Sequence, residues 1–443
     1  MAEIAPFCGL RYNTEKLDNL ADVVIPPYDV ISPKEQELFH QISPYNMVHL
    51  ELGRTLPQDS ESNNAHTRAA KDLRKWQQEQ ILTRDDRPAI YYYELTYSVS
   101  SEIRQTRYGF ICTLRLEDFS TGFVRPHEKT FQAVKDERLG LMKACEANLS
   151  PVFALYSDPA MVVDHTLRIG REPNPLMSFR DRVGMEHRMW RVVNPEIFQR
   201  VKALMLDKPI YIADGHHRYE TALNYRTIQQ QRLGNSSPDA PFEYIMMYLS
   251  NLDQGGLTIL PTHRLLRHMG PWEPQGFLRD AAAYFDILEF NTTTEGQVKW
   301  REELEKGGST KETLIGLYWR NADAFFLLKG KHEVISSYLS SRGISKVLHR
   351  LDVVILDQLL LRHLLEMSDV FLANERNIHF KHDLIDAVSS VQSGTYEAGF
   401  FINPTRIEQV QEVASAGLIM PHKATYFYPK VWSGLVVHTL ASP

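Results

Sequence analysis

The sequence has few cysteines and no long apolar run. It contains three cysteines in 443 residues, Cys8, Cys112 and Cys145, and none stands in a CxxC pair. So sparse and odd a set argues against a disulfide framework and against a zinc ribbon. The apolar run of about 18 residues that a membrane-spanning helix needs is absent, and the N-terminus has no secretory pattern. We therefore expect a cytoplasmic protein without a membrane partner.

No charge of one sign dominates the chain. Lysine and arginine total 49 and aspartate and glutamate 55, which gives a formal net charge of -6. The basic residues are scattered, whereas a nucleic-acid-binding protein usually carries a dense basic face. We expect no nucleic-acid partner. A small anion needs only a local positive site, so it stays a compatible ligand. The composition does not determine the oligomeric state.

The best-known nucleotide and hydrolase motifs are also absent. The sequence has no GxxxxGK[ST] loop, no GxGxxG and no GxSxG, so the common NTPase, dinucleotide-binding and hydrolase classes lack support. What is present is ordinary globular composition, 43% hydrophobic and 23% charged residues. A chain of this length is too long for one ordinary core and indicates at least two domains.

Hydrophobic patterning predicts an α/β (α+β) protein. Residues 89–98 and 108–116 are rich in tyrosine and β-branched residues and predict a hairpin. Residues 209–213 predict a strand that turns tightly into a helix over about 217–232, and a second strand follows over 242–249. Strand, turn, helix and strand in this order form an α/β unit.

Two domains are expected. Residues 1–65 look irregular, and the remainder of an N-terminal domain extends to residue 269. From about residue 270 new helix and strand patterns begin, including a buried helix over 353–366, and they predict a C-terminal α+β domain over 270–443. Gly270-Pro271 marks the expected boundary.

The strongest local signal is the turn Asp214-Gly215-His216-His217-Arg218. The first N–H groups of a helix lack intrahelical partners and lie at the positive end of its dipole, so they attract phosphate or carboxylate. Gly215 permits a tight turn, Arg218 offers a bidentate fork, and the two histidines can donate or relay protons. The turn predicts a small ligand that bears phosphate. The alternative is that Asp214 only caps the helix.

A metal site is a competing interpretation of the same turn. Asp214, His216 and His217 are potential ligands, but adjacent residues rarely converge on one ion, and no HxxxH or HExxH pattern accompanies them. We therefore assign no metal ligand, and a metal-dependent hydrolase remains an alternative.

A second motif is Arg125-Pro126-His127-Glu128-Lys129-Thr130. A histidine and a glutamate beside lysine and threonine can supply a general base and an anion contact. Taken alone, the motif is better explained as a solvated loop; together with the Asp214 turn it gains weight, because phosphoryl transfer needs both a base and a positive site. His127, Glu128 and Asp214 are the catalytic candidates. Further binding-site candidates lie in this motif, shortly after it and in three other motifs. They are Tyr28, Asp29, Thr130, Arg138, His263 and Arg264 for the substrate, and Lys423 and Lys430 for the phosphate.

Seven stretches of the chain closely resemble a bacterial family known only as a domain of unknown function, DUF1015. They are PFCGLRYN, PPYDVIS, RPHEKT, SPVFALYSD, IADGHHRYETA, ILPTHRLL and MPHKATYFYPKVWSGLVV. More distantly, IADGHHRYETA is similar to the signature of the ParB/sulfiredoxin superfamily, especially of its free serine kinases. In those kinases, as here, a Pro-His-Glu segment precedes an Asp-Gly-His-x-Arg turn.

The distant resemblance implies a ParB/sulfiredoxin-like core with large insertions, because Glu128 and Asp214 are farther apart here than in those kinases. It implies that Glu128 is the base and that residues 215–218 hold the phosphates of ATP or ADP. Asp214 would assist the substrate or Mg²⁺. Sulfiredoxins carry cysteine where His216 stands, so their thiol chemistry is not expected.

Three functions follow as hypotheses. The first is a nucleotide-dependent phosphotransferase, an amino-acid kinase for example, that acts on a small hydroxylated metabolite such as free serine; it predicts Glu128 and Arg218 in one cleft. The second is a nucleotide-sensing regulatory protein without turnover, which needs no base. The third is the metal-dependent hydrolase.

Overall fold

The computed structural model describes residues 1–99, 103–234, 237–374 and 376–441. The chain divides into two compact units. The first unit comprises Met1–Pro126, Thr130–Leu257 and Pro429–Pro443, and the second comprises His127–Lys129 and Thr258–Tyr428. The division at residue 270 stays a prediction, and the two units have different bounds from it.

A mixed sheet forms the centre of the first unit. Its strands are β1 (Ile4–Ala5), β4 (Ile90–Ser98), β5 (Arg104–Arg115), β6 (Val124–Arg125), β8 (Val152–Tyr156), β9 (Met177–Arg180), β10 (Glu186–Val192), β11 (Ile210–Asp214) and β12 (Tyr244–Asn251). Within the described residues their order is β6-β11-β8-β12-β5-β4-β10-β9, and β1 also pairs with β5. Two short pairs accompany the sheet, β2 (Leu10–Tyr12) with β3 (Leu82–Arg84) and β7 (Ala147–Asn148) with β21 (His438–Thr439).

The strand pairing confirms the mixed α/β class. β4 and β5 pair antiparallel from Tyr91 opposite Ile111 to Ser98 opposite Arg104, as the hairpin prediction required. β8 and β11 are buried along their whole length, which suits the continuous apolar sequence of strands covered on both faces. β8 lies between β11 and β12, antiparallel to the first and parallel to the second. The predicted strand-turn-helix-strand unit therefore crosses over one intervening strand.

The described helices of the first unit include the one that the sequence predicted over about 217–232, which is α7 (His216–Leu233). The others are α1 (Pro33–Ile42), α2 (Val48–Glu51), α3 (Ala65–Gln78), α4 (Gln132–Cys145), α5 (Val162–Gly170) and α6 (Pro195–Met205), with short 3-10 turns at Leu20–Asp22, Tyr28–Val30, Phe119–Thr121 and Pro241–Glu243. The Asn194 side chain caps α6, because it accepts a hydrogen bond from the Glu196 N–H group. The expectation of irregular structure over residues 1–65 was wrong for α1, whose capping box joins Ser32 and Glu35.

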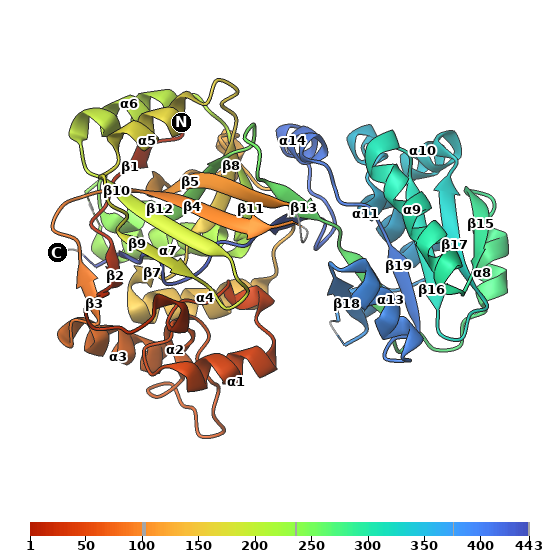
Figure 1. Cartoon of the computed structure of the whole chain (residues 1–443), viewed down its shortest axis with the longest axis horizontal. Coiled ribbons are helices and arrows are strands. Elements are labelled where there is room, and N and C mark those ends of the chain that lie inside the picture. The colour runs from red at the N-terminus through yellow and green to blue at the C-terminus, as the bar shows by residue number, and fades with distance from the viewer. Residues whose placement is uncertain (100–102, 235–236, 375, 442–443) are drawn as a thin grey trace. The chain divides into compact units, whose positions relative to one another are not determined.

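Helix packing brings α4 and α7 together. In the first unit α4 contacts both α3 and α7, and α5 contacts α6 (Figure 1). The core between helices and sheet contains Val152, Ala154, Ile210, Ile212 and Tyr219. The end of β11 and the first turn of α7 are thus fixed by buried apolar side chains.

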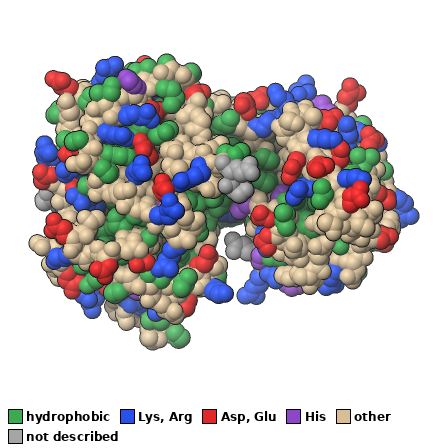
Figure 2. Space-filling model, viewed as in Figure 1, with side chains coloured by type: hydrophobic (Ala, Val, Ile, Leu, Met, Phe, Trp, Pro, Cys, Tyr) green, Lys and Arg blue, Asp and Glu red, His purple; other side chains and the backbone are tan. Residues whose placement is uncertain are grey.

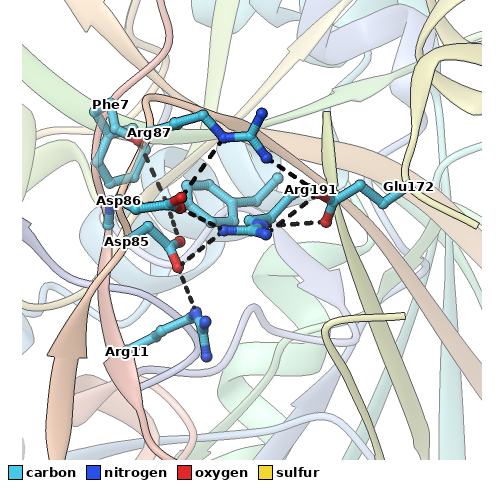
Figure 3. Close-up of polar contacts among 9 residues, drawn as sticks. Phe7, Arg11, Asp85, Asp86, Arg87, Glu172 and Arg191 are labelled. Atoms are coloured by element: carbon cyan, nitrogen blue, oxygen red, sulfur yellow. Dashed lines mark hydrogen bonds and ion pairs between the residues drawn. The ribbon is translucent and has the colours of Figure 1, made fainter. Parts of the chain in front are cut away.

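A network of ion pairs joins strands far apart in the sequence (Figure 3). The buried carboxylate of Asp85 accepts hydrogen bonds from Arg11 Nε at 2.8 Å and from the Tyr91 hydroxyl at 2.7 Å. Arg191 lies 3.5 Å from Asp85 and 3.1 Å from Glu172. The network connects β2, β4 and β10, so it has a structural role that explains its charged residues.

The second unit is built around another sheet. Its strands are β13 (Thr258–Leu260), β14 (His263–Leu266), β15 (Phe285–Asn291), β16 (Leu314–Trp319), β17 (Ala324–Gly330), β18 (Ile378–Lys381), β19 (Ala398–Phe401) and β20 (Tyr426–Tyr428). Its helices are α8 (Pro274–Ala281), α9 (Thr294–Thr310), α10 (His332–Ser341), α11 (Asp352–Ile355), α12 (Asp369–Leu372), α13 (Leu384–Gln392) and α14 (Ile407–Ser415), with a 3-10 turn at Lys346–Leu348 and a π-helix at Leu356–Leu364. The described strands follow the order β15-β17-β16-β19-β14-β18, and β13 pairs with β20.

Two groups of residues singled out in the second unit have a local structure that the sequence did not predict. The predicted helix over 353–366 is helical, but most of it is the π-helix that follows α11. The substrate candidates His263 and Arg264 are the first two residues of strand β14, whose four residues are all buried. Among the described residues, no helix combines the length and the apolar composition that a membrane crossing requires.

Candidate functional site

The turn after β11 has a backbone shape that requires glycine. β11 ends at Asp214, with a register shift against β8 between Ile212 and Asp214. Gly215 follows with φ at +89°, and α7 begins at His216. A Cβ atom on Gly215 would lie 2.9 Å from the Arg218 Nε atom. The turn therefore excludes a side chain on two grounds, the left-handed backbone and the guanidinium packed against it.

Asp214, Arg218 and Lys430 form a buried charge cluster. One carboxylate oxygen of Asp214 bonds the Arg218 Nη2 atom at 2.6 Å, and the other bonds the Lys430 ammonium group. Arg218 Nη1 also donates to the carbonyl oxygen of Pro151. All three charged side chains are about nine-tenths buried. Two cations therefore contact one carboxylate at the positive end of α7, where an anion is favoured.

A cavity of about 40 Å³ lies beside Arg218 in the first unit. Its lining comprises Glu51, Arg138, Leu141, Met142, Ala147, Asn148, Leu149, Ser150, Arg218, Thr221 and Ile245. Three lining residues each have a buried polar atom without a hydrogen-bond partner within the described parts of the chain: Glu51 Oε2, Arg218 Nε and Thr221 Oγ1. Buried polar groups are normally satisfied, so these three atoms are exceptions beside the cavity.

Arg138 lies in the same lining and is surrounded by acidic and aromatic groups. Its guanidinium lies 4.1 Å from the ring centre of Tyr28, and its Nη1 donates to the Glu51 carbonyl oxygen at 2.9 Å. It also forms an ion pair with Glu137. Burial opposes ionisation of Glu137, but hydrogen bonds from His66 and Arg138 lower its pKa to about 2. Asp29, the neighbour of Tyr28, is exposed.

The first turn of α7 also holds the segment that leads into α4. Thr130 Oγ1 donates to Glu220 Oε1 at 2.8 Å, and Lys135 Nζ donates to Glu220 Oε2 at 2.8 Å. The Phe131 N–H group donates to His217 Nε2 at 2.9 Å. His217 therefore has its Nε2 lone pair directed at the backbone, while His216 is buried in the turn. These contacts join the segment before α4 to α7, and the roles of Thr130 in substrate binding and of His217 in phosphate binding stay predictions.

His127 and Glu128 belong to the second unit. His127 is fully buried, and its Nε2 lies 2.9 Å from Thr425 Oγ1. Glu128 Oε1 accepts a hydrogen bond from the Lys423 N–H group at 2.7 Å and lies 3.1 Å from His422 Nδ1. The structure thus gathers His127, Glu128 and Lys423 in one unit, and Asp214 to Arg218 with Lys430 in the other.

His263 and Arg264 have structural partners in the second unit. Burial and the charge of Arg264 lower the pKa of His263 to about 3, and its Nδ1 accepts the Ile402 N–H at 3.3 Å. Burial also lowers the pKa of Arg264 to about 10. The Arg264 guanidinium donates to carbonyl oxygens, including that of Lys423 at 3.0 Å. A role in substrate binding stays a prediction for both residues.

The residues at the α7 turn fit an anion better than a metal ion. Within the described residues, no group of three or more histidine, cysteine, aspartate or glutamate side chains is arranged to hold a metal. Both oxygens of Asp214 contact cations, so this carboxylate does not fit the role of a Mg²⁺ ligand. The Arg218 guanidinium and the helix start fit phosphate.

Two residues of the cavity, Glu51 and Thr221, are not among those predicted from the sequence. Thr221 follows Arg218 by three residues on α7, and this spacing places both on one helix face. That signal was present in the sequence. Glu51 gave no local signal, because only tertiary packing places the end of α2 against α4 and Ser150.

The comparisons with known proteins establish a family and little else. No curated protein matches the sequence. A solved free serine kinase mutant in complex with ADP is similar at 13% identity and a TM-score of 0.32, covering 69% of this chain and 84% of its own. A conserved hypothetical protein from Pyrococcus furiosus has 14% identity and a TM-score of 0.31, with 70% and 89% covered. SbnI from Staphylococcus aureus, with its C-terminus truncated, has 9% identity and a TM-score of 0.30, with 74% and 86% covered.

TM-scores this low carry no argument about the fold or function of this chain. The family model is more informative, because it matches residues 4–354 of the 443. These residues include the PHE motif, the α7 turn and the cavity lining. The chain belongs to the family described as protein of unknown function, DUF1015.

Proposed function

We propose that this protein is a nucleotide-dependent phosphotransferase whose acceptor is a small hydroxylated metabolite, with free serine as the first acceptor to test. The observation that carries the proposal is the buried cluster of Asp214, Arg218 and Lys430 at the start of α7. Phosphoryl transfer depends mainly on positioning and on electrostatic stabilisation of phosphate oxygens. A fixed cationic cluster at a helix start supplies both.

Arg218 is the central residue of this proposal. Its contacts with Asp214 and Pro151 restrict the guanidinium before any ligand binds, so less conformational entropy is lost on binding. Lys430 adds a second positive charge without needing to touch the ligand. In this proposal the helix start and Arg218 bind phosphate oxygens, and Asp214 holds Arg218 in place.

The order of the motifs supports a kinase over a simple phosphate-binding protein. Pro126-His127-Glu128 precedes the Asp214 turn, as in the free serine kinases that the sequence resembles. We propose Glu128 as the base. It would take the proton of the acceptor hydroxyl as that oxygen bonds to phosphorus and the bond from phosphorus to the nucleotide breaks.

Phosphorus NMR tests this function. The full chain is incubated with Mg²⁺, pooled free amino acids and either ATP or ADP. A new phosphomonoester signal is expected with the native protein, and it should vanish in Glu128→Gln. Glu302→Gln, at an exposed position of α9, is the matched control and should retain the signal. Saturable nucleotide binding with unchanged phosphorus signals would overturn the kinase proposal in favour of a sensor.

A further inference from the structure

We infer that Arg107 is a positioning residue of the proposed phosphate site, because it fixes the Pro429 carbonyl and thereby places Lys430 against Asp214. Arg107 was not among the candidates that the sequence singled out. The inference rests on the proposed function only for the statement that the charge cluster binds phosphate. The contacts that place Lys430 are observed directly and do not depend on that function.

The guanidinium of Arg107 lies across two neighbouring strands of the first-unit sheet. Arg107 belongs to β5, and its Cζ atom is 5.3 Å from the ring centre of Tyr248 on β12 and 4.7 Å from that of Phe153 on β8. Tyr248 is opposite Phe153, and Phe153 is opposite Asp214, in the strand register. Residues directly opposite one another in neighbouring strands share one face of a sheet, so the guanidinium lies on the face that carries Asp214.

Arg107 holds the backbone where the chain returns to the first unit. Tyr428 ends the long segment of the second unit, and Pro429 is the first residue of the final first-unit segment. Because a proline has no N–H group, its carbonyl oxygen is the only backbone group of Pro429 that can form a hydrogen bond. Arg107 Nη1 donates to that oxygen. The next residue, Lys430, bonds Asp214 through its ammonium group.

The charge of Arg107 indicates a role beyond folding. On the visible face of the molecule, lysine and arginine side chains are interspersed with acidic ones (Figure 2). Arg107, in contrast, is 0% exposed, and its Nε and Nη2 atoms have no hydrogen-bond partner within the residues that the structure describes. Burying a cation with unpaired donors is costly, even though the two rings offset part of the cost. A neutral donor could bond one carbonyl oxygen at a lower cost.

The position of Lys430 determines how Asp214 shares its charge. One carboxylate oxygen of Asp214 contacts Lys430 and the other contacts Arg218. With Lys430 in place, the carboxylate charge is divided between two cations, which leaves the Arg218 guanidinium better able to attract phosphate. If the Pro429 carbonyl is released and Lys430 moves, Asp214 pairs with Arg218 alone. The affinity of the helix start for phosphate should then fall.

Labelling of lysines with an amine-reactive reagent, followed by mass spectrometry, tests the position of Lys430 in the full chain without ligand. Lys430 is 9% exposed and should react slowly in the native protein. In Arg107→Met its rate should rise at least about tenfold, because local opening exposes the amine. Lys135, which is paired with Glu220 at 2.8 Å, is the internal reference and should keep its rate.

The matched control is Arg115→Met. Arg115 is also on β5, and its guanidinium lies 5.7 Å from the ring centre of a β12 tyrosine, Tyr244. Arg115 has no contact with the segment that carries Lys430 among its hydrogen bonds within the described residues, which join it to Glu3, Tyr244 and Pro238. This variant should leave Lys430 protected.

ATP titrations of single and double variants then test the connection to the site. If Arg107 acts through Lys430, Arg107→Met and Lys430→Met each weaken ATP binding. The double variant should bind ATP within about twofold of Lys430→Met alone. Additive losses would overturn the inference, because Arg107 would then act independently of Lys430. Unchanged labelling of Lys430 in folded Arg107→Met would overturn it as well, and so would an equal rise at Lys135.

The outcomes separate this inference from the proposed function. If Arg107→Met does not fold, Arg107→Gln replaces it, because the shorter side chain also loses the Pro429 carbonyl; native protection of Lys430 in that variant would overturn the inference. Selective exposure of Lys430, with no ATP binding by the native chain, would support the positioning contact and overturn the proposed function. ATP binding that Arg107→Met leaves unchanged would support the nucleotide site and overturn the inference.

Discussion

Asp214 and Arg218 are bonded at 2.6 Å between Oδ2 and Nη2, although one ends strand β11 and the other belongs to helix α7. Gly215 between them makes this contact feasible, because its positive φ turns the chain back within one residue. The pair sets the direction of the guanidinium at the helix start. The geometry of the site therefore depends on a local contact that mutation can probe.

Asp214→Asn should destabilise the protein by about 3 kcal/mol, because it leaves two buried cations without their carboxylate. Adding Lys430→Met should restore part of this loss, since it removes one of the two cations. Urea denaturation monitored by tryptophan fluorescence measures both effects. Glu312→Gln, which breaks the exposed pair with Lys329, is the control and should leave the midpoint almost unchanged. Equal midpoints for Asp214→Asn and the native chain would contradict the claim that Asp214 stabilises the two buried cations.

Gly215→Ala should lower both stability and ligand affinity. The cost of a left-handed alanine is on the order of 1 kcal/mol, and the added Cβ also displaces Arg218. Gly184 has nearly the same φ, +87°, but a Cβ atom added there would meet no other atom within 4 Å. Gly184→Ala therefore measures the backbone cost alone. If both variants lose equal stability and bind nucleotide equally, the close packing of Gly215 against Arg218 does not contribute to nucleotide binding.

Sequence patterns predict the local parts of this site and miss the distant ones. The strand, the glycine turn and the start of α7 depend on neighbouring residues, so periodicity and helix-start chemistry are sufficient to predict them. The partnership of Lys430 with Asp214 joins residues 216 positions apart, and no local rule predicts such a pair. No local pattern predicts the place of Glu51 beside the cavity either, because its contacts with Arg138 and Ser150 also join residues far apart in the sequence. The helix α1 is different, because its capping box of Ser32 and Glu35 is a local pattern of the sequence.

Thr130→Val should affect structure more than substrate recognition. The Thr130 hydroxyl donates a hydrogen bond to Glu220 Oε1, so the substitution leaves that carboxylate oxygen without this hydrogen bond. We expect faster hydrogen exchange of the amides over residues 130–135 and a loss of stability of about 1 kcal/mol. The KM for the acceptor should stay within about twofold of the native value. A large rise in KM without faster exchange would instead identify Thr130 as a substrate contact.

Asp164 should make stability fall as the pH rises. Burial raises its pKa to about 6, although hydrogen bonds from Asn251 and Tyr156 oppose the shift. Because the folded carboxyl keeps its proton to a higher pH than the unfolded one, its contribution is present at low pH. It is lost as the pH rises through the folded pKa.

The free energy of unfolding should therefore fall by roughly 2 kcal/mol between about pH 4 and pH 7 through this group alone. Asp164→Asn lacks the titrating proton, so the difference between native and variant stability should change by that amount across the range. Urea titrations of both proteins at several pH values measure it. A difference that is independent of pH would show that Asp164 ionises normally in the folded state.

The most direct measurement of the central claim is calorimetric binding of ATP and ADP to the native chain and to Arg218→Gln. We predict saturable binding to the native protein and a loss of at least about tenfold in the variant, because the positive charge of the guanidinium is removed from the proposed phosphate site. Far-ultraviolet circular dichroism should show that the variant is folded. Equal affinity of the folded variant and the native protein for both nucleotides would contradict the claim that the start of α7 binds phosphate.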